Sequence, residues 1–411
     1  MTLGSLLTDV LGPEPPVGVV AYDGTRIGPA DPPVTIVIRR PDALRRIVQS
    51  PGELGFVRAY VAGDLEIEGD IFSLFRLRDL LSTVKLTPAQ TLQAARILGL
   101  RALRPLAPPP EEARLVGRRY TPARSRAALA HHYDLPDEFF ALFLDPSMAY
   151  TTAIFESEED SLEQAQSNKF DLICRKLALE PDMRLLDIGC GWGGMLLHAA
   201  KHYGVSAVGV SLSLRQVEWT RKRVAEEGLS GRIDIRHVDY REVDDGPYQA
   251  VSAIGSFEHI GLHDGQFFRK VQALLAPRGR FLNHAISQPP GRNAPAARRG
   301  FMQRYVFPDS EIHEVGHVVS AMQAAGLEVR HVESLREHYS LTLRRWVRNL
   351  EDHWEAAVAL VGAGRARVWR LYMAGFAVNF DRDDSSHHQV LAVRPEPAGR
   401  SGMPLRPTWT S

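Results

Sequence analysis

Short apolar runs alternate with helix-like segments through the second half of the chain. The apolar runs are four to six residues long and are typical of buried strands, while the segments between them carry apolar residues at helical spacing. The predicted strands are residues 184–188, 207–210, 233–238, 250–254 and 280–285, and the predicted helices between them are 193–203, 213–227 and 262–275. This alternation predicts an α/β fold with a doubly wound, mainly parallel, Rossmann-like sheet.

The first hundred residues follow another pattern. Residues 34–38 are typical of a strand, residues 41–50 place apolar side chains at helical spacing, and residues 71–81 again indicate a helix. They predict a small α+β domain without a visible reactive constellation. Prolines at positions 105 and 108–110 cannot continue a helix, which predicts a stiff extended linker. The predicted organisation is a first domain at 1–104, a linker at 105–113, a second domain at 114–395 and a disordered tail at 396–411.

Composition narrows the class of protein. The 411 residues are 44% hydrophobic and 24% charged, which indicates a folded globular protein. Lys plus Arg and Asp plus Glu both number 49, so the whole-chain charge gives no reason to expect a nucleic-acid partner. Cys174 and Cys190 are too few for a disulfide framework or a zinc site, and we expect no metal. The scarcity of cysteines fits a reducing cytoplasm, and we expect a cytoplasmic protein. No leader-like or bilayer-spanning apolar stretch is visible.

Arginines crowd around the predicted linker, where only Glu111 and Glu112 oppose them. They stand at positions 96, 101, 104, 114, 118, 119, 124 and 126. One interpretation is a solvated helix face. The other is a patch attracted to anionic lipid head groups, where each basic residue contributes on the order of 1 kcal/mol.

A glycine run ends the first predicted strand of the second domain. It follows Asp187 and spaces three glycines as Gly-x-Gly-x-Gly from Gly189 to Gly193, a turn that lets the backbone approach a ligand and opens a helix. This spacing favours a methyltransferase over a dinucleotide-binding enzyme, which uses G-x-G-x-x-G. After the second strand, Ser211 stands where an acidic residue often binds the ribose, so the run alone leaves the nucleotide open.

Further motifs appear in one order along residues 130 to 395. They are His132-Tyr133-Asp134-Leu135, Leu144-Asp145-Pro146, Tyr150-Thr151-Thr152-Ala153, the LDIGCGWGG run, Val208-Gly209-Val210-Ser211, Phe257-Glu258-His259-Ile260-Gly261, His284-Ala285-Ile286, Tyr305-Val306-Phe307-Pro308, and His338-Tyr339 followed by Leu341-Thr342-Leu343 and Trp346. With these motifs the chain resembles the cyclopropane-fatty-acyl-phospholipid synthase family, which includes the mycolic acid cyclopropane synthases. The first domain is similar to the N-terminal module of the phospholipid-acting members.

The resemblance implies a class I methyltransferase domain that binds S-adenosylmethionine. The residues it places around this cofactor are Tyr150, Thr151, Asp187, Gly189, Cys190, Gly191, Trp192, Gly193, Ser211, Leu212 and Gln216, with Asp239 and Tyr240 beside the adenine. It also implies that a serine replaces the acidic ribose ligand. Cys190 is interpreted as a small residue that fits a tight turn, not as a nucleophile.

The implied reaction adds a one-carbon unit across the cis double bond of an unsaturated fatty acyl chain on a phospholipid. An alkene is a poor nucleophile, so the site must align it with the methyl donor and stabilise a carbocation. Family members hold a bicarbonate ion that deprotonates the cation, and its ligands here would be Glu258, His284, Tyr339 and backbone groups near Thr152 and Ile286. A carboxylate facing bicarbonate should share a proton or have a shifted pKa.

Thr152 stands where many relatives have cysteine, which argues against a covalent thiol mechanism. A methylene- or methyl-branched product follows from the same cation and remains open. A non-catalytic lipid-binding protein is the alternative from another class. The expected partner is the acyl chain of a membrane phospholipid, reached by peripheral contact with the inner face of the cell membrane. The first domain is expected to serve lipid or membrane docking, or else homo-oligomerisation.

Overall fold

The structure is a computed structural model that describes residues 2–75, 87–99, 104–116, 121–262, 265–291 and 300–409. Contacts divide the chain into two units. The first comprises Met1–Leu115, Ala294–Pro308 and Leu350–Val378, and the second comprises Val116–Asn293, Asp309–Asn349 and Asn379–Ser411.

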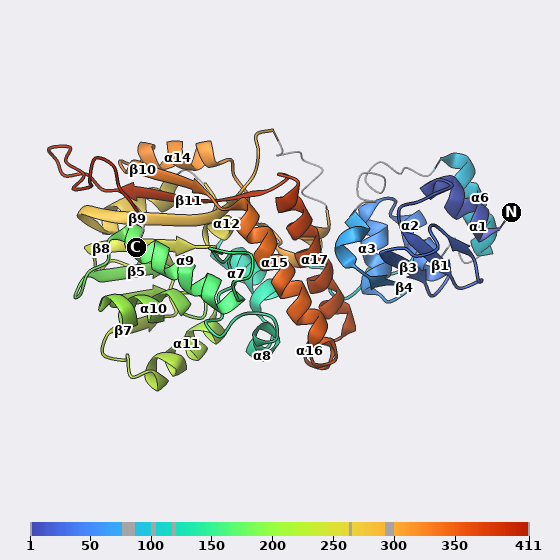
Figure 1. Cartoon of the computed structure of the whole chain (residues 1–411), viewed down its shortest axis with the longest axis horizontal. Coiled ribbons are helices and arrows are strands. Elements are labelled where there is room, and N and C mark those ends of the chain that lie inside the picture. Colours follow the sequence, from blue (N-terminus) through green and yellow to red (C-terminus); the bar gives the residue numbers. More distant parts are fainter. Residues whose placement is uncertain are drawn as a thin grey trace. The chain divides into compact units, whose positions relative to one another are not determined.

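The second unit is built on a sheet of seven strands (Figure 1). In spatial order they are β10 (Glu328–Ser334), β11 (Ser386–Val393), β9 (Leu275–Ser287), β8 (Tyr248–Ile254), β5 (Arg184–Ile188), β6 (Ser206–Val210) and β7 (Ile233–Arg236). Strands β5 to β9 pair in parallel, whereas β11 pairs antiparallel with β9 and with β10. The predicted mainly parallel α/β fold is confirmed. The sequence pattern missed β10 and β11.

Helices cover both faces of this sheet. Leu185 of β5 belongs to an apolar cluster with Ile173 and Leu196, while the next residue, Leu186, packs on the other face with Phe268 and other apolar side chains. Side chains alternate across a strand, so a strand with helices on both faces is apolar throughout. The first face carries α9 (Leu162–Leu177), α10 (Gly194–Tyr203) and α11 (Leu214–Glu226), and the second carries α13 (Gln266–Leu274) and α14 (Val315–Ala324).

Four further helices of the described chain bear on the site. They are α7 (Pro122–Tyr133), α8 (Asp137–Ala141), α12 (Phe257–Ile260) and α15 (Arg336–Asp352). A 3-10 turn, Tyr240–Glu242, follows β7. Among the described residues, none of the helices is both long and apolar enough to cross a bilayer.

The first unit contains a four-stranded sheet in the order β2 (Arg26–Ile27), β1 (Gly18–Ala21), β3 (Val34–Ile38) and β4 (Leu65–Gly69). Its N-terminal helices are α1 (Leu3–Leu11), α2 (Asp42–Gln49), α3 (Glu53–Val61), α4 (Ile71–Leu74) and α6 (Pro88–Leu98). The predicted strand 34–38 and helix 41–50 are present. Of the predicted helix 71–81, residues 76–81 lie outside the described residues. The helix α16 (Trp354–Val361) and most of α17 (Ala363–Asp381) complete this unit.

The predicted linker differs from the structure because Glu112 is buried. Its carboxylate accepts hydrogen bonds from Arg58 (2.9 Å to each oxygen), Arg304 (2.5 Å) and the Tyr305 hydroxyl (3.1 Å). The Ala113 backbone N–H donates to the Arg304 carbonyl at 2.6 Å. Arg304 and Tyr305 come from a segment that the sequence interpretation placed in the second domain, whereas Arg58 belongs to the predicted first domain.

The predicted disordered tail also differs from the structure. Glu396 forms an ion pair with Arg278 at 2.7 Å, and Trp409 packs edge-on against His331. Ser401 accepts a hydrogen bond from Arg330 at 3.1 Å. The described part of the tail therefore packs against the second unit to which it belongs.

Candidate active site

A cavity of about 230 Å³ lies where parallel strands β5, β6 and β8 end. Ile188 closes β5, Ser211 follows β6, and Ile254 closes β8, and all three line the cavity. The carboxyl ends of parallel strands meet at one edge of a sheet, which is the usual ligand position in open α/β folds. All the predicted cofactor residues line this cavity except Gly193.

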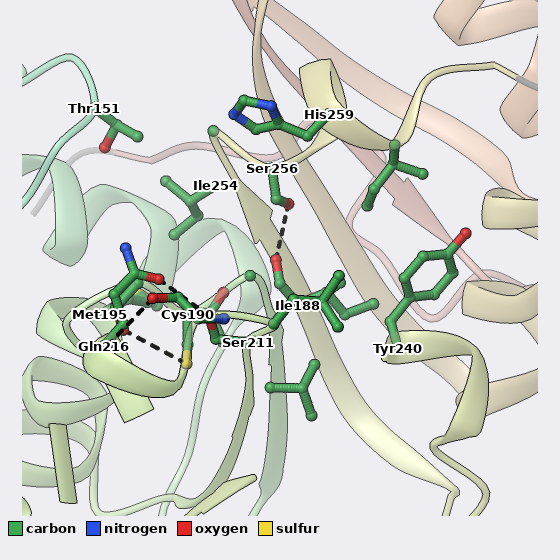
Figure 2. A pocket seen from close by; sticks show the side chains of 18 of the residues that line it. Thr151, Ile188, Cys190, Met195, Ser211, Gln216, Tyr240, Ile254, Ser256 and His259 are labelled. Carbon is green, nitrogen blue, oxygen red and sulfur yellow. Dashed lines mark hydrogen bonds between the residues drawn. The ribbon is translucent and has the colours of Figure 1, made fainter. Parts of the chain in front are cut away.

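The glycine turn is required by its surroundings. Gly189 has φ +77°, and a Cβ there would lie 2.5 Å from the Cβ of Ser256. Ser256 itself donates a hydrogen bond to the Ile188 carbonyl at 2.8 Å (Figure 2), which joins the ends of β5 and β8. Gly193 has another role: a Cβ there would lie 2.3 Å from Thr220, so its glycine permits close packing of α11.

The cavity has two chemically different sides (Figure 2). Tyr240 stands on one side and packs edge-on against Phe267, with ring centroids 5.3 Å apart. On the opposite side lie Gln216 and Thr151, where the Ser211 hydroxyl donates to the Gln216 carboxamide oxygen at 3.0 Å. The apolar ring suits a flat base, and the hydroxyl-amide pair offers polar atoms for sugar hydroxyls.

Asp187 and Cys190 have pKa values raised by burial, whereas Asp239 is held by an arginine. Both carboxylate oxygens of Asp239 accept hydrogen bonds from Arg241. Burial raises the pKa of Asp187 to about 6, although a hydrogen bond from Ser252 opposes this shift. Burial also raises the pKa of the Cys190 thiol far above neutrality, so it stays protonated, as expected for a packing residue.

Tyr133 of α7 forms part of one wall, and His132 packs edge-on against it. His132 lies 3.2 Å from the Tyr150 hydroxyl, and the Tyr133 hydroxyl lies 3.4 Å from Nε2 of His259. Tyr133 also packs edge-on against Trp192 of the glycine run. This side of the cavity, which holds Tyr150, is therefore lined mainly by aromatic rings.

The predicted catalytic residues form a second, buried cluster that does not line the cavity. The Ile286 backbone N–H donates to Oε1 of Glu258 at 2.7 Å, so this N–H holds the carboxyl group. The His284 ring lies 4.1 Å from the ring of His387, which in turn packs edge-on against Tyr339 at 5.2 Å. The structure thus links His284 of β9 to Tyr339 of α15 through His387 of β11, while Glu258 of α12 is held beside β9 by its bond to Ile286.

Thr152 belongs to the same region through its neighbour on α15. Its hydroxyl donates to the Ala153 carbonyl at 3.1 Å and lies 3.5 Å from the Thr342 hydroxyl, one helical turn after Tyr339. Chain connectivity keeps the cluster beside the cavity. Thr152 follows the cavity residue Thr151, and Glu258 precedes the cavity residue His259.

Three buried polar atoms of this cluster lack a hydrogen-bond partner among the described residues. They are Oε2 of Glu258, Nε2 of His284 and Nδ1 of His387. Burial raises the pKa of Glu258 to about 7 and lowers the pKa of His284 well below its ordinary value. Near neutral pH both protonation states of Glu258 are therefore populated, while His284 is neutral. Buried polar groups need partners, so the cluster favours a small polar ligand.

Two residues of this region were missed from the sequence. His387 lies on the unpredicted strand β11, whose buried run gave the only local signal. Lys169 lies on α9, is fully buried and lines the cavity. A lysine inside a helical pattern is normally solvent-exposed, so its position could not be read from spacing.

Comparisons with known proteins identify relatives of this chain. The family model described as mycolic acid cyclopropane synthetase matches residues 121–390. A Mycobacterium tuberculosis protein named as a probable fatty acid methyltransferase is 43% identical over 96% of this chain and 95% of its own length. A tuberculostearic acid methyltransferase of that organism is 30% identical over 93% of this chain and 88% of its own.

Among solved structures, a mycolic acid cyclopropane synthase complexed with SAH and CTAB is 32% identical, with a TM-score of 0.62. The match covers 65% of this chain and 98% of that structure. The first unit's N-terminal part lies outside the family match, which begins at residue 121. The chain belongs to the mycolic acid cyclopropane synthetase family and is a methyltransferase of that family.

Proposed function

We propose that the protein is an S-adenosylmethionine-dependent C-methyltransferase that adds a one-carbon unit to the cis double bond of an unsaturated phospholipid acyl chain. The observation that carries this proposal is the pair of adjoining sites: a cavity at the glycine turn and a buried Glu258–His284–His387 cluster beside it. The relatives named as lipid-modifying methyltransferases, and the related structure complexed with SAH, support it.

The cavity residues fit the parts of this cofactor. Tyr240 offers a ring face to the adenine, Ser211 and Gln216 offer polar atoms to the ribose, and Thr151 stands opposite Tyr240 (Figure 2). S-adenosylmethionine supplies the methyl group. The protein's residues orient it and keep water away, which matters because an alkene attacks weakly.

Bicarbonate fits the second cluster. The unpartnered atoms of Glu258, His284 and His387 are a mixed set of donors and acceptors, as a partly protonated oxyanion requires. With its pKa near 7, Glu258 can carry the proton that avoids two bare negative charges. Bound there, bicarbonate would supply a base for the substrate cation.

Stacked and edge-on aromatic rings connect the cavity with the buried cluster. Tyr150 stacks on Trp346 with centroids 5.2 Å apart, and Trp346 packs edge-on against Tyr339 at 6.3 Å. Ring faces attract positive charge, so these residues can stabilise a carbocation where water would quench it.

A branched product is the second candidate. It is favoured by the tuberculostearic acid methyltransferase, which matches nearly the whole chain. Incubating the protein with dioleoyl phosphatidylglycerol vesicles and S-adenosylmethionine is expected to add one methylene unit per modified chain, seen by mass spectrometry. Ozonolysis then separates the products, because ozone cleaves a methylene branch on the chain to a ketone and leaves a cyclopropane intact. An unmodified lipid, together with no thermal stabilisation by S-adenosylhomocysteine, would favour a non-catalytic lipid-binding protein.

The location and membrane contact are part of the proposal. Arg96, Arg104 and Arg114 are exposed, whereas Arg124 is paired with Asp309 at 2.5 Å. The arginines at 101, 118 and 119, and the side chain of Arg126, lie outside the described residues. We propose that the exposed arginines hold this cytoplasmic protein at the anionic inner face of the membrane.

Liposome binding tests the membrane contact. Binding of the full chain is expected to rise with the anionic lipid fraction and to weaken as salt approaches 1 M, where the Debye length is about 3 Å. The variant with Arg96, Arg104 and Arg114 changed to Gln is expected to bind at least threefold more weakly. If neither salt nor these substitutions change liposome binding, homo-oligomerisation remains as the role of the N-terminal domain. A chain truncated near Ala113 is a poor test, because it would remove the partners of Arg304.

A further inference from the structure

One face of α9 holds the cavity wall that contains Thr151. Gln166 donates hydrogen bonds from Nε2 to the carbonyls of Ala149 (3.2 Å) and Thr151 (2.9 Å). One turn later, Nζ of Lys169 donates to the Thr151 hydroxyl at 2.7 Å. Residues three apart share a helix face, so both side chains reach the same short segment.

Lys169 is a buried ammonium group without an ion-pair partner among the described residues. Its side chain is fully buried and lies over the Phe170 ring, with Nζ 4.4 Å from the centroid. Among the described residues, Asp145 and Asp187 act on it through space, but neither forms an ion pair with it. A buried charge normally has a partner of opposite sign, and Lys169 lines the cavity.

The hydrogen bond to Lys169 also decides what Thr151 can do. An ammonium can only donate, so the Thr151 oxygen must accept, and its own O–H proton points elsewhere. Thr151 lines the cavity on the side opposite Tyr240 (Figure 2). That side therefore offers an O–H donor backed by a positive charge, which suits a carboxylate.

We propose that Lys169 is a positioning residue that acts through Thr151, a residue already expected to contact the cofactor, and that it makes the Thr151 hydroxyl a donor to the α-carboxylate of the cofactor's amino-acid end. The inference rests on the proposed function, because it assumes an adenosyl cofactor whose base lies near Tyr240. It gives a role to a lysine that is fully buried on α9.

The charge state of Lys169 should make ligand binding depend on pH. Burial lowers the pKa of Lys169 to about 7, and the attraction of Asp145 and Asp187 opposes this shift. His284 and His387 also face it, but their own pKa values lie so low that they are neutral here. An anion bound beside Lys169 raises its pKa, so binding should take up a proton between pH 7 and 8.5.

The test compares two ligands by calorimetry on the full chain. S-adenosylhomocysteine carries the α-carboxylate, and 5′-methylthioadenosine lacks the whole amino-acid end. Lys169→Met and Thr151→Val are each expected to weaken S-adenosylhomocysteine at least tenfold and 5′-methylthioadenosine less than threefold. Their effects on S-adenosylhomocysteine should not add in the double variant, because Lys169 acts through Thr151. Thr151→Ser keeps the hydroxyl and should therefore bind S-adenosylhomocysteine as the parent does.

Lys176→Met is the matched control. Lys176 is also fully buried on α9, but Nζ contacts Gln389 (2.6 Å) and Glu333 and does not line the cavity. This variant should lose stability while its preference between the two ligands stays within threefold of the parent.

Each outcome decides the matter. Equal weakening of both ligands, or of neither, by Lys169→Met would overturn the carboxylate subsite. If Lys169→Met does not fold, the parent still answers: its affinity for S-adenosylhomocysteine should fall several-fold from pH 7 to 8.5, with proton uptake, while that for 5′-methylthioadenosine stays constant. Identical pH profiles would reject the inference. A parent that binds neither ligand would overturn the proposed function itself.

Discussion

Glu258→Gln and His284→Ala are each expected to lower kcat at least tenfold while the affinity for S-adenosylhomocysteine changes only a few-fold. Neither side chain lines the cavity, yet both carry buried polar atoms that lack a partner among the described residues. Removing a group that acts only in the chemical step lowers kcat and kcat/KM together. Steady-state rates beside a calorimetric titration provide the measurement.

Stability separates this effect from misfolding. Because burial raises the pKa of Glu258 to about 7, the stability that its protonated form contributes is complete below about pH 4.5 and is lost as the pH rises through 7. Glutamine has no charge to bury, so Glu258→Gln should be at least as stable as the parent at pH 8. Glu242→Gln, at an exposed position, is the control and should leave kcat unchanged. Equal losses of turnover and cofactor affinity would assign Glu258 a structural role.

The second large effect is expected at Glu112. Replacing it with alanine leaves the Arg58 guanidinium, whose side chain is 16% exposed, without its carboxylate, and removes the acceptor of Arg304 and Tyr305. Burial alone would raise the pKa of Glu112, but hydrogen bonds from Arg58 and Arg304 outweigh it and lower the pKa. Breaking a buried ion pair from one side costs about 3–5 kcal/mol, and we expect about 3 because Arg304 is partly exposed.

Urea unfolding followed by circular dichroism measures this loss. Glu68→Ala is the matched control, because its carboxylate is 60% exposed and lies 4.0 Å from Arg39. It should change the free energy of unfolding by less than about 0.5 kcal/mol. If Glu112→Ala unfolds no earlier than Glu68→Ala, residues 105–113 behave as the free linker that the prolines suggested.

Local patterns predicted the cavity well and the long-range partners poorly. The glycine run predicts its turn because the positive φ of Gly189 strongly favours glycine. The strand before it, β5, is also short and apolar. Lys169 and His387 gave no such signal, since a polar residue in an apolar pattern normally indicates a surface position. The partners of Glu112 are also invisible locally, because Arg304 lies 192 residues away.

The first unit is assembled from three separate segments of the chain, so it cannot finish folding until the last of them has been translated. Its N-terminal part ends at Leu115, but its last part begins at Leu350, so residues 116–349 must be synthesised in between. At roughly 5–20 residues per second, a ribosome needs about 10–50 s to cover that distance. During this time the Tyr60 hydroxyl lacks Arg370, which donates a hydrogen bond to it in the finished fold. The nascent N-terminal part should therefore be a substrate for chaperones, and release from the ribosome, not emergence of the first hundred residues, should complete its protection from proteases.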